Sequence, residues 1–176
     1  MKLSSLPSYI QIKVMPAGKV PLLLRWQLWW WKKRTFRLDM RLAPAQWYIL
    51  AFVEGSLVSV LEIVRRRGSV GGDSLTLGLL GGVITAPRWR GRGYGSALLK
   101  HAAGFICDEM GCDFGLLFCG EGLVAFYERL GWQLVPNAYV YDQPRGKTEG
   151  HLKLMVFPCR GQGFPQGLVD LEGLPL

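Results

Sequence analysis

The sequence predicts one α/β domain, a mixed and mostly antiparallel sheet of about seven strands flanked by helices. Three observations predict it. Strand patterns form hairpins before residue 86, a helical period follows a glycine-rich loop, and short strands then alternate with another helix. The 176 residues suit a single core, so we treat residues 1–176 as one domain.

The expected elements run strand, helix, three antiparallel strands, helix, strand, helix and two strands. Alternating or continuous apolar patterns predict strands at residues 8–14, 47–53, 57–66, 75–85, 114–119, 132–135 and 152–157. Apolar residues at helical spacing predict helices at residues 20–36, 96–110 and 123–130. Gly111 and Gly131 follow the last two helices, which is typical of C-terminal caps.

The composition indicates a globular, basic protein. Apolar residues make up 49% and charged residues 19%, and 21 Lys and Arg against 13 Asp and Glu leave a net charge of +8. Such a charge suits nucleic acid, an anionic membrane or an anionic ligand. Because the arginines cluster at one loop rather than along one face, we expect no nucleic-acid partner.

The cysteines and the apolar segments bear on location. Cys107, Cys112, Cys119 and Cys159 match no common zinc spacing, so we expect no metal and four reduced thiols. Residues 1–15 lack a signal-peptide pattern, and the apolar stretch 20–31 is too short and too polar to span a membrane. These features predict a cytoplasmic protein.

The loop at residues 90–95, Arg-Gly-Arg-Gly-Tyr-Gly, lies between a strand and a helix. Its glycines let backbone N–H groups approach a ligand, and the helix N-terminus adds partial positive charge. The arginines Arg88, Arg90 and Arg92 suit phosphate oxygens. The pattern therefore predicts a ligand that carries phosphate groups.

Two other interpretations of this loop are weaker. Gly91, Gly93 and Ser96 roughly match the dinucleotide motif G-x-G-x-x-[GA], but Pro87 and two arginines separate the strand from the first glycine. A simple tight turn does not explain three arginines around three glycines.

Two segments carry a family resemblance. Residues 83–99, VITAPRWRGRGYGSALL, resemble the acetyl-CoA-binding motif [QR]-x-x-G-x-[GA] of GNAT N-acetyltransferases. Residues 123–132, LVAFYERLGW, are similar to the A-x-x-[FL]-Y-x-x-x-G-[FW] helix of the same family. The resemblance covers roughly residues 45–158. It implies the GNAT acyl-CoA N-acyltransferase fold and direct transfer of an acetyl group from acetyl-CoA to an amine.

The resemblance also implies site residues. Acetyl-CoA would bind along Val83, Ile84, Thr85, Arg90, Gly91, Arg92, Gly93, Tyr94, Gly95 and Ser96. The backbone N–H of Val83 would polarise the thioester carbonyl, and Tyr127 would protonate the leaving thiolate. The alternative for Tyr127 is a tyrosine of the core.

The general base is not identified by the resemblance. Several relatives carry a glutamate two residues before the position of Val83, and here that position is Gly81. The candidate carboxylates are Glu62, Asp73 and Glu121, each of which is more typical of a surface charge.

The acceptor amine is left open among several classes. From Tyr127 to Pro158 the chain resembles aminoglycoside 2′-N-acetyltransferases, which implies antibiotic resistance. On this resemblance Glu121, Glu149 and Asp170 would meet a cationic small molecule, and the tail 159–176 would wrap the surface or the acceptor site. The alternatives are a different small amine, a peptide or protein amine, and a non-catalytic acyl-CoA-binding module.

The tryptophans Trp26, Trp29, Trp30 and Trp31 precede three cations, Lys32, Lys33 and Arg34. They could pack in the core or at a homodimer interface, line the acceptor pocket, or lie at a membrane interface. Packing is the favoured interpretation, and membrane contact through the Trp29 to Trp31 region is the least favoured.

Overall fold

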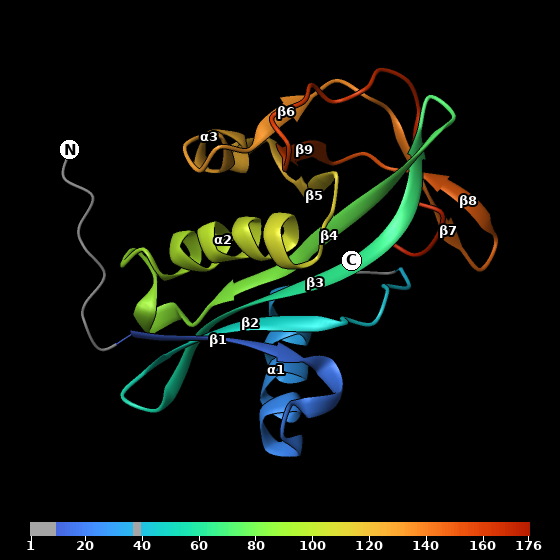
Figure 1. Cartoon of the computed structure of the whole chain (residues 1–176). Helices are drawn as coiled ribbons and strands as arrows, with labels where there is room; N and C mark the ends of the chain where they lie inside the picture. Colours follow the sequence, from blue (N-terminus) through green and yellow to red (C-terminus); the bar gives the residue numbers. More distant parts are fainter. Residues whose placement is uncertain (1–9, 37–39) are drawn as a thin grey trace.

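The computed structural model describes residues 10–36 and 40–176, and it contains a ten-stranded mixed sheet (Figure 1). The strand order is β6-β9-β5-β4-β3-β10-β7-β8. Strand β10 pairs with the end of β3, strand β2 pairs with the beginning of β3, and β1 pairs with β2. The strands are β1 Ile10–Pro16, β2 Trp47–Val53, β3 Ser56–Val70, β4 Asp73–Thr85, β5 Phe114–Cys119, β6 Gln133–Val135, β7 Tyr139–Gln143, β8 Gly146–Glu149, β9 Lys153–Pro158 and β10 Val169–Asp170.

Strands β2, β3 and β4 form the predicted antiparallel meander. Gly55 turns the chain between β2 and β3 with φ of +74°, and Gly71 and Gly72 turn it between β3 and β4 with φ of +59° and +99°. Glycine tolerates these left-handed angles because it has no Cβ. The strands predicted at 57–66 and 75–85 are confirmed and extend further toward their shared turn.

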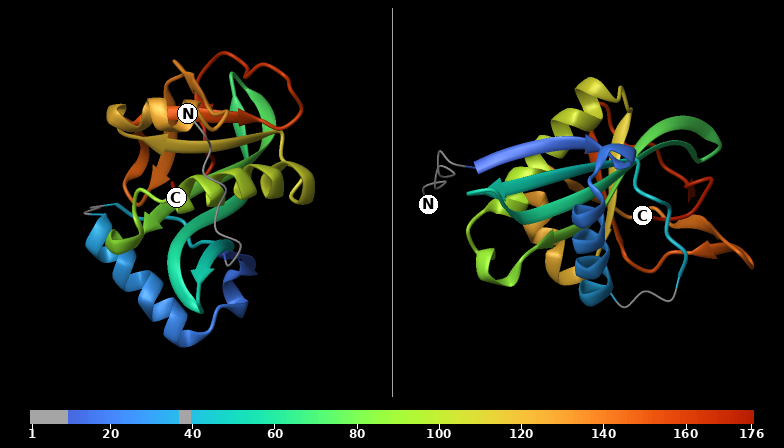
Figure 2. Two further views of the ribbon diagram at one scale, coloured as in Figure 1. Left: turned by 90° about the vertical axis from the view of Figure 1, so that its left-hand side faces the viewer. Right: turned by 90° about the horizontal axis from the view of Figure 1, so that it is seen from below.

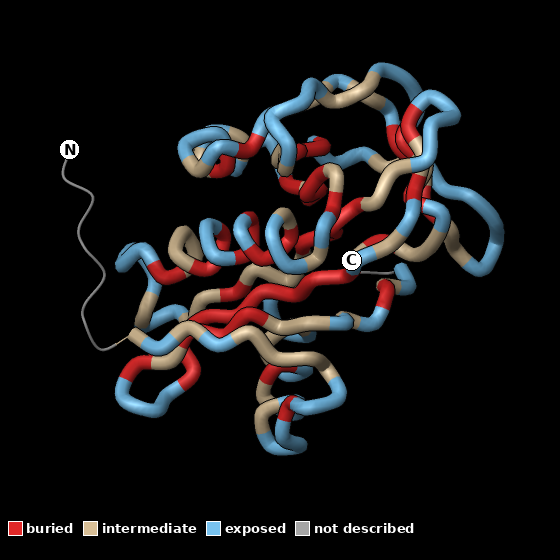
Figure 3. The backbone as a smooth tube through the Cα atoms, in the orientation of Figure 1, coloured by how far each residue is buried: buried red, intermediate tan, exposed pale blue. Residues whose placement is uncertain are grey.

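Two longer helices cover opposite faces of the sheet (Figure 2). Helix α1, Leu22–Thr35, packs through Leu28 on a cluster that contains Leu50, and helix α2, Tyr94–Gly104, packs on a cluster that contains Ile49 and Ala51. Neighbouring residues of β2 serve the two clusters because successive side chains of a strand point to opposite faces. The buried residues accordingly concentrate along the centre of the sheet (Figure 3).

The later helices differ in detail from the prediction. Helix α2 passes into a π-helical turn, η3, Phe105–Glu109, instead of continuing as an α-helix to residue 110. Gly111, with φ of +61°, ends this segment as predicted. The third helix consists of a 3-10 turn, η4, Glu121–Leu123, and a short helix, α3, Val124–Glu128.

The prediction of about seven strands misses β7, β8 and β10. All residues of β8 are exposed, and β10 has two residues, so neither has a pattern of its own. Strand β10 comes from the tail and pairs with β3 and β7. Residues 8 and 9 of the first predicted strand lie outside the described residues, and β1 is the described part of it.

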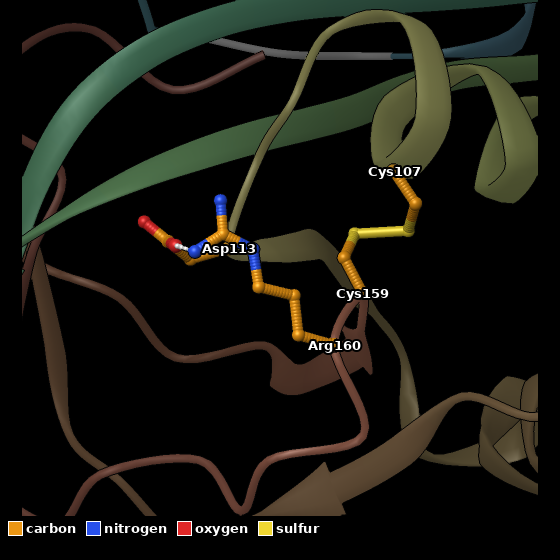
Figure 4. The surroundings of a disulfide bond; sticks show 4 residues. All are labelled: Cys107, Asp113, Cys159 and Arg160. Carbon is orange, nitrogen blue, oxygen red and sulfur yellow. Dashed lines mark ion pairs between the residues drawn. A yellow bond between two sulfur atoms is a disulfide. The ribbon is translucent and has the colours of Figure 1, made fainter.

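The expectation of four reduced thiols is wrong for one pair. Cys107 and Cys159 form a disulfide with a Cα–Cα distance of 4.9 Å (Figure 4). Cys112 and Cys119 are free and buried. Next to the disulfide, Arg160 forms an ion pair with Asp113 at 3.3 Å, and the Cys159 N–H donates to the Asp113 carbonyl. The end of β9 meets the π-helical turn here, which the cysteine spacing does not reveal.

Candidate active site

The site begins where two parallel strands separate. Strands β4 and β5 pair only through residues 77–79 and 114–116, and no pairing continues beyond them. A cavity of about 350 Å³ lies at this opening, between residues 80–83 and residues 117–120. The carboxyl ends of parallel strands are a common place for a ligand.

A β-bulge shapes the β4 wall of the cavity. Between Val60 and Glu62 of β3, the single residue Leu61 faces both Gly82 and Val83 of β4. Gly82 has φ of +57°, and a Cβ on it would lie 3.0 Å from the Glu62 Cδ atom, so glycine suits this position. Val83 has no partner in the register with β5, so the edge of β4 that faces the cavity is open to a ligand here.

The glycine-rich loop leads from β4 to α2. Gly91 and Gly93 adopt left-handed φ angles of +72° and +82°, and Gly93 is the N-cap residue of α2. The first turn of α2 has no acidic residue and receives no cap hydrogen bond from a described side chain. Its N–H groups therefore suit an anion.

Trp89 organises the cations of this loop. The guanidinium groups of Arg88 and Arg92 lie 5.6 and 5.0 Å from its ring centroid, and its ring packs edge-on against Tyr94. The Trp89 Nε1 atom is buried and has no hydrogen-bond partner among the described residues. An unpartnered donor, three arginines and an uncapped helix together fit a phosphate-bearing group such as coenzyme A.

The expected cofactor residues occupy one continuous path. Residues 83–85 end β4 beside the cavity, and residues 90–96 form the loop and the start of α2. Arg90 links the loop to the end of β4, because its Nε donates a hydrogen bond to the Thr85 carbonyl at 3.1 Å. Tyr94 is 2% exposed, so only its backbone is placed to meet a ligand.

Tyr127 of α3 lies at the cavity wall and is 7% exposed. Its ring packs edge-on against Phe126 and Trp132. Burial raises its pKa to about 12, and the neighbouring Cys119 adds to the increase. The phenol therefore keeps its proton at neutral pH and has one to donate.

Glu62 is buried, and its interpretation as a surface charge is wrong. It is 7% exposed and lies opposite Gly81 in the β3–β4 ladder. Lys32 of α1 also lines the cavity, and its Nζ lies 2.5 Å from the Glu62 Oε2 atom. The other two candidate bases, Asp73 and Glu121, are exposed.

The three expected acceptor carboxylates are not among the residues that line the cavity. Glu121 pairs with Lys153 at 2.9 Å, and Asp170 pairs with Lys147 at 2.6 Å. Glu149 belongs to the exposed strand β8. The structure therefore does not bring these residues together at the site.

Other segments supply most of the remaining wall. The lining residues outside the expected site are Lys32, Phe36, Met40, Leu42, Leu80, Gly81, Gly82, Leu117, Phe118, Cys119, Gly120, Leu123, Tyr139, Tyr141, His151, Leu152, Pro175 and Leu176. The spacing of Tyr139 and Tyr141 on one side of β7 is the signal in the sequence that could have indicated this strand. The position of His151 depends on tertiary contacts alone.

The tryptophan cluster divides into two parts. Trp31 packs on the sheet with the cluster that contains Leu28, whereas Trp26, Trp29 and Trp30 are 70, 52 and 45% exposed. None of the four lines the cavity. The expectations of core packing and of pocket lining are therefore wrong for Trp26, Trp29 and Trp30. No helix in residues 10–36 and 40–176 is long and apolar enough to cross a membrane.

Separated parallel strands, a bulge at the wall and a loop suited to an anion are the features that the resemblance implies for an acyltransferase that uses an acyl-coenzyme A. The family model of the acetyltransferase (GNAT) domain matches residues 27–135. This match spans more than half of the chain, so the chain belongs to the GNAT family and is an acetyl-CoA-dependent N-acetyltransferase.

Solved structures share the fold at low sequence identity. Escherichia coli ElaA is 16% identical with a TM-score of 0.62, over 84% of this chain and 99% of ElaA. YhbS from Escherichia coli, solved in complex with CoA, is 16% identical with a TM-score of 0.63, over 95% of each chain. An acyl-CoA N-acyltransferase from Pseudomonas aeruginosa is 17% identical with a TM-score of 0.58, over 84% of this chain and 97% of that one. No curated protein is significantly similar in sequence.

Proposed function

We propose that this enzyme transfers the acetyl group of acetyl-CoA to the primary amine of a small molecule with a largely apolar body. The lining of the cavity carries the proposal. Its side chains are mainly aliphatic and aromatic, and no aspartate or glutamate is among the described lining residues. Apolar surface gains about 25 cal/mol per Å² when it leaves water, whereas a polycationic amine would lose hydration without finding anionic partners.

This lining does not favour the aminoglycoside predicted from the sequence. Glu121 and Asp170 already pair with lysines, and Glu149 is exposed. Lys32 and the overall charge of +8 also disfavour a polycation. An aminoglycoside acceptor therefore stays a prediction of the sequence pattern and is tested below beside the apolar amines.

In the proposal, acetyl-CoA lies along the path from Val83 to Ser96. The phosphates meet the first turn of α2 and the guanidinium groups beside Trp89, and the pantetheine arm follows the end of β4. Support comes from the left-handed glycines, the uncapped helix and the bulge at Gly82. The thioester then reaches the opening between β4 and β5, where Tyr127 lies.

The proposed step is direct attack. The neutral amine forms a C–N bond with the thioester carbon, and the C–S bond breaks. The Val83 N–H stabilises the oxyanion, and Tyr127 gives its proton to the departing thiolate. Glu62 takes the proton of the amine through water and releases it to solvent, and the phenol regains a proton from solvent.

The tail and the location complete the proposal. We infer a single domain in which the tail helps to enclose the acceptor, because Pro175 and Leu176 line the cavity and Pro175 accepts a hydrogen bond from the Ala43 N–H.

A cytoplasmic location agrees with the use of acetyl-CoA. The Cys107–Cys159 disulfide removes the support that the cysteines gave to this location.

The experiment is thiol release from acetyl-CoA with a panel of amines. The panel contains aryl-alkyl amines, alkyl amines, polyamines, aminoglycosides, amino acids and short peptides. We expect the highest kcat/KM with apolar monoamines. A higher kcat/KM with an aminoglycoside or a peptide would overturn the acceptor class but keep the enzyme. Tight acetyl-CoA binding by calorimetry without any turnover would contradict the proposed transfer.

A further inference from the structure

Helix α1 has an apolar face that points to solvent. Its exposed large side chains are Leu22, Leu23, Trp26, Trp29 and Trp30, of which Leu23 is 89% exposed. At 3.6 residues per turn these five positions fall within about 120° of the helix circumference. They therefore form one stripe, which we call the outer face of α1.

The opposite face of α1 is already occupied. Leu24, Leu28 and Trp31 pack with the cluster of the sheet that contains Val60 and Ile84. The helix is thus apolar on two sides, and the sheet covers only one of them. Packing within this chain leaves the outer face exposed to solvent. An exposed apolar patch of this kind is typical of an interaction site.

Cations border the outer face. On the helix, Arg25 and Arg34 fall on its two sides and Lys33 falls within it. Lys33 Nζ lies 4.9 Å from the Trp29 ring centroid, and the Arg34 guanidinium lies 5.5 Å from that of Trp30. These cation–π contacts keep the two charged groups next to the indole rings of the outer face.

The aromatic part of the face is ordered as well. The rings of Trp26 and Trp30 stack with an interplanar angle of 9° and a centroid distance of 6.4 Å. No acidic residue occurs anywhere in α1. The surface therefore offers stacked indoles and leucines together with positive charge only.

We propose that the outer face of α1 docks on the surface of an anionic lipid bilayer. Indole and leucine side chains favour the boundary between headgroups and acyl chains, and arginine and lysine favour anionic headgroups. The overall charge of +8 acts in the same direction. The helix lies in the plane of the surface and does not cross the bilayer.

The charges also argue against a second copy as the partner. A symmetric dimer through this face would place Arg25, Lys33 and Arg34 of one copy against the same cations of the other. With no carboxylate in α1 to neutralise them, these cations would repel. A bilayer that carries anionic headgroups has the complementary charge.

The test is co-sedimentation of the full chain with lipid vesicles. We expect binding to vesicles of equimolar phosphatidylcholine and phosphatidylglycerol, and little binding to phosphatidylcholine alone. Raising the ionic strength from about 0.1 M to about 1 M should weaken the binding, because the Debye length falls from roughly 10 Å to 3 Å. Equal binding to both kinds of vesicle, or none to either, would overturn the proposal.

Variants locate the surface. Joint replacement Trp26→Ser, Trp29→Ser and Trp30→Ser should weaken vesicle binding at least about tenfold, and Arg25→Gln and Lys33→Gln about fivefold each. Leu134→Ser and Arg145→Gln are matched controls, since both side chains are exposed on other elements. Thermal unfolding checks that each variant folds. Undiminished binding by the folded tryptophan variant, or a dimer in solution that this variant dissociates, would contradict the bilayer as partner.

Discussion

Glu62 lies directly opposite Gly81 across the β3–β4 ladder and contacts the bulge at Gly82. The family resemblance implies a glutamate at the position of Gly81 in several relatives, and in this chain a carboxylate lies on the neighbouring strand instead. Its ion pair with Lys32 brings it to the edge of the cavity. The register of the two strands thus places the Glu62 carboxylate beside the bulge, next to the stretch of β4 that lines the cavity.

Glu62→Gln should lower kcat about 10²-fold if the carboxylate accepts the proton of the amine. The affinity for acetyl-CoA should not change, because Glu62 lies on β3 and away from the phosphate loop. Steady-state kinetics and calorimetry measure the two quantities. Glu121→Gln is the control, since it removes an exposed carboxylate paired with Lys153. An unchanged kcat in the Glu62 variant would exclude this role.

Tyr127→Phe should lower kcat by about 10²-fold while the Kd of acetyl-CoA stays within about twofold, since the hydroxyl acts on the leaving thiolate. Tyr141→Phe removes a second hydroxyl from the same cavity and should leave kcat near the wild-type value. Full turnover by the Tyr127 variant would remove this residue from the mechanism.

Gly93→Asp should abolish measurable acetyl-CoA binding, because it places a carboxylate among the phosphates and a side chain at φ of +82°. Arg92→Gln leaves the backbone unstrained and should weaken binding about tenfold. Gly163→Asp, in open space in the tail, is the control. Calorimetry measures the affinity of each variant for coenzyme A. Wild-type affinity in both the Gly93 and the Arg92 variant would contradict the proposed phosphate site.

The Cys107–Cys159 bond closes a loop with a sequence separation of 52 residues. In the chain-entropy model such a cross-link stabilises a fold by about 4 kcal/mol. Cys107→Ser should therefore lower the free energy of unfolding by roughly 2–4 kcal/mol in urea titrations, and reduction of the wild type should have the same effect. A reductant should not destabilise the Cys107 variant further, and an additional loss there would indicate another disulfide.

Stability should fall steeply at alkaline pH. Burial raises the pKa of Tyr127 and of Tyr139 from 10.0 to about 12. Below pH 10 both states keep these protons, and between about pH 10 and 12 only the unfolded state loses them, so each tyrosine lowers stability by about 1.4 kcal/mol per pH unit. Tyr139→Phe should remove one such contribution from the slope of unfolding free energy against pH. An identical slope in this variant would contradict the raised pKa.

The sequence alone determined the local elements and the ligand loop. Short continuous apolar runs predicted β2 and β5, and a helical period predicted α2, because these signals depend on neighbours along the chain. The glycines of residues 90–95 predicted a loop whose backbone can approach a ligand, and the left-handed φ angles of Gly91 and Gly93 came from the structure. Two motifs, residues 83–99 and 123–132, carried the resemblance to the family.

The tertiary structure decided which distant residues meet. The pairing of Glu62 with Gly81, the disulfide, and the place of His151 and Leu176 at the cavity all join segments far apart in the chain. The exposure of Trp26 was decided in the same way, since the sheet can cover only one face of a doubly apolar helix. Periodicity shows which side chains share a face, but long-range packing selects what covers it.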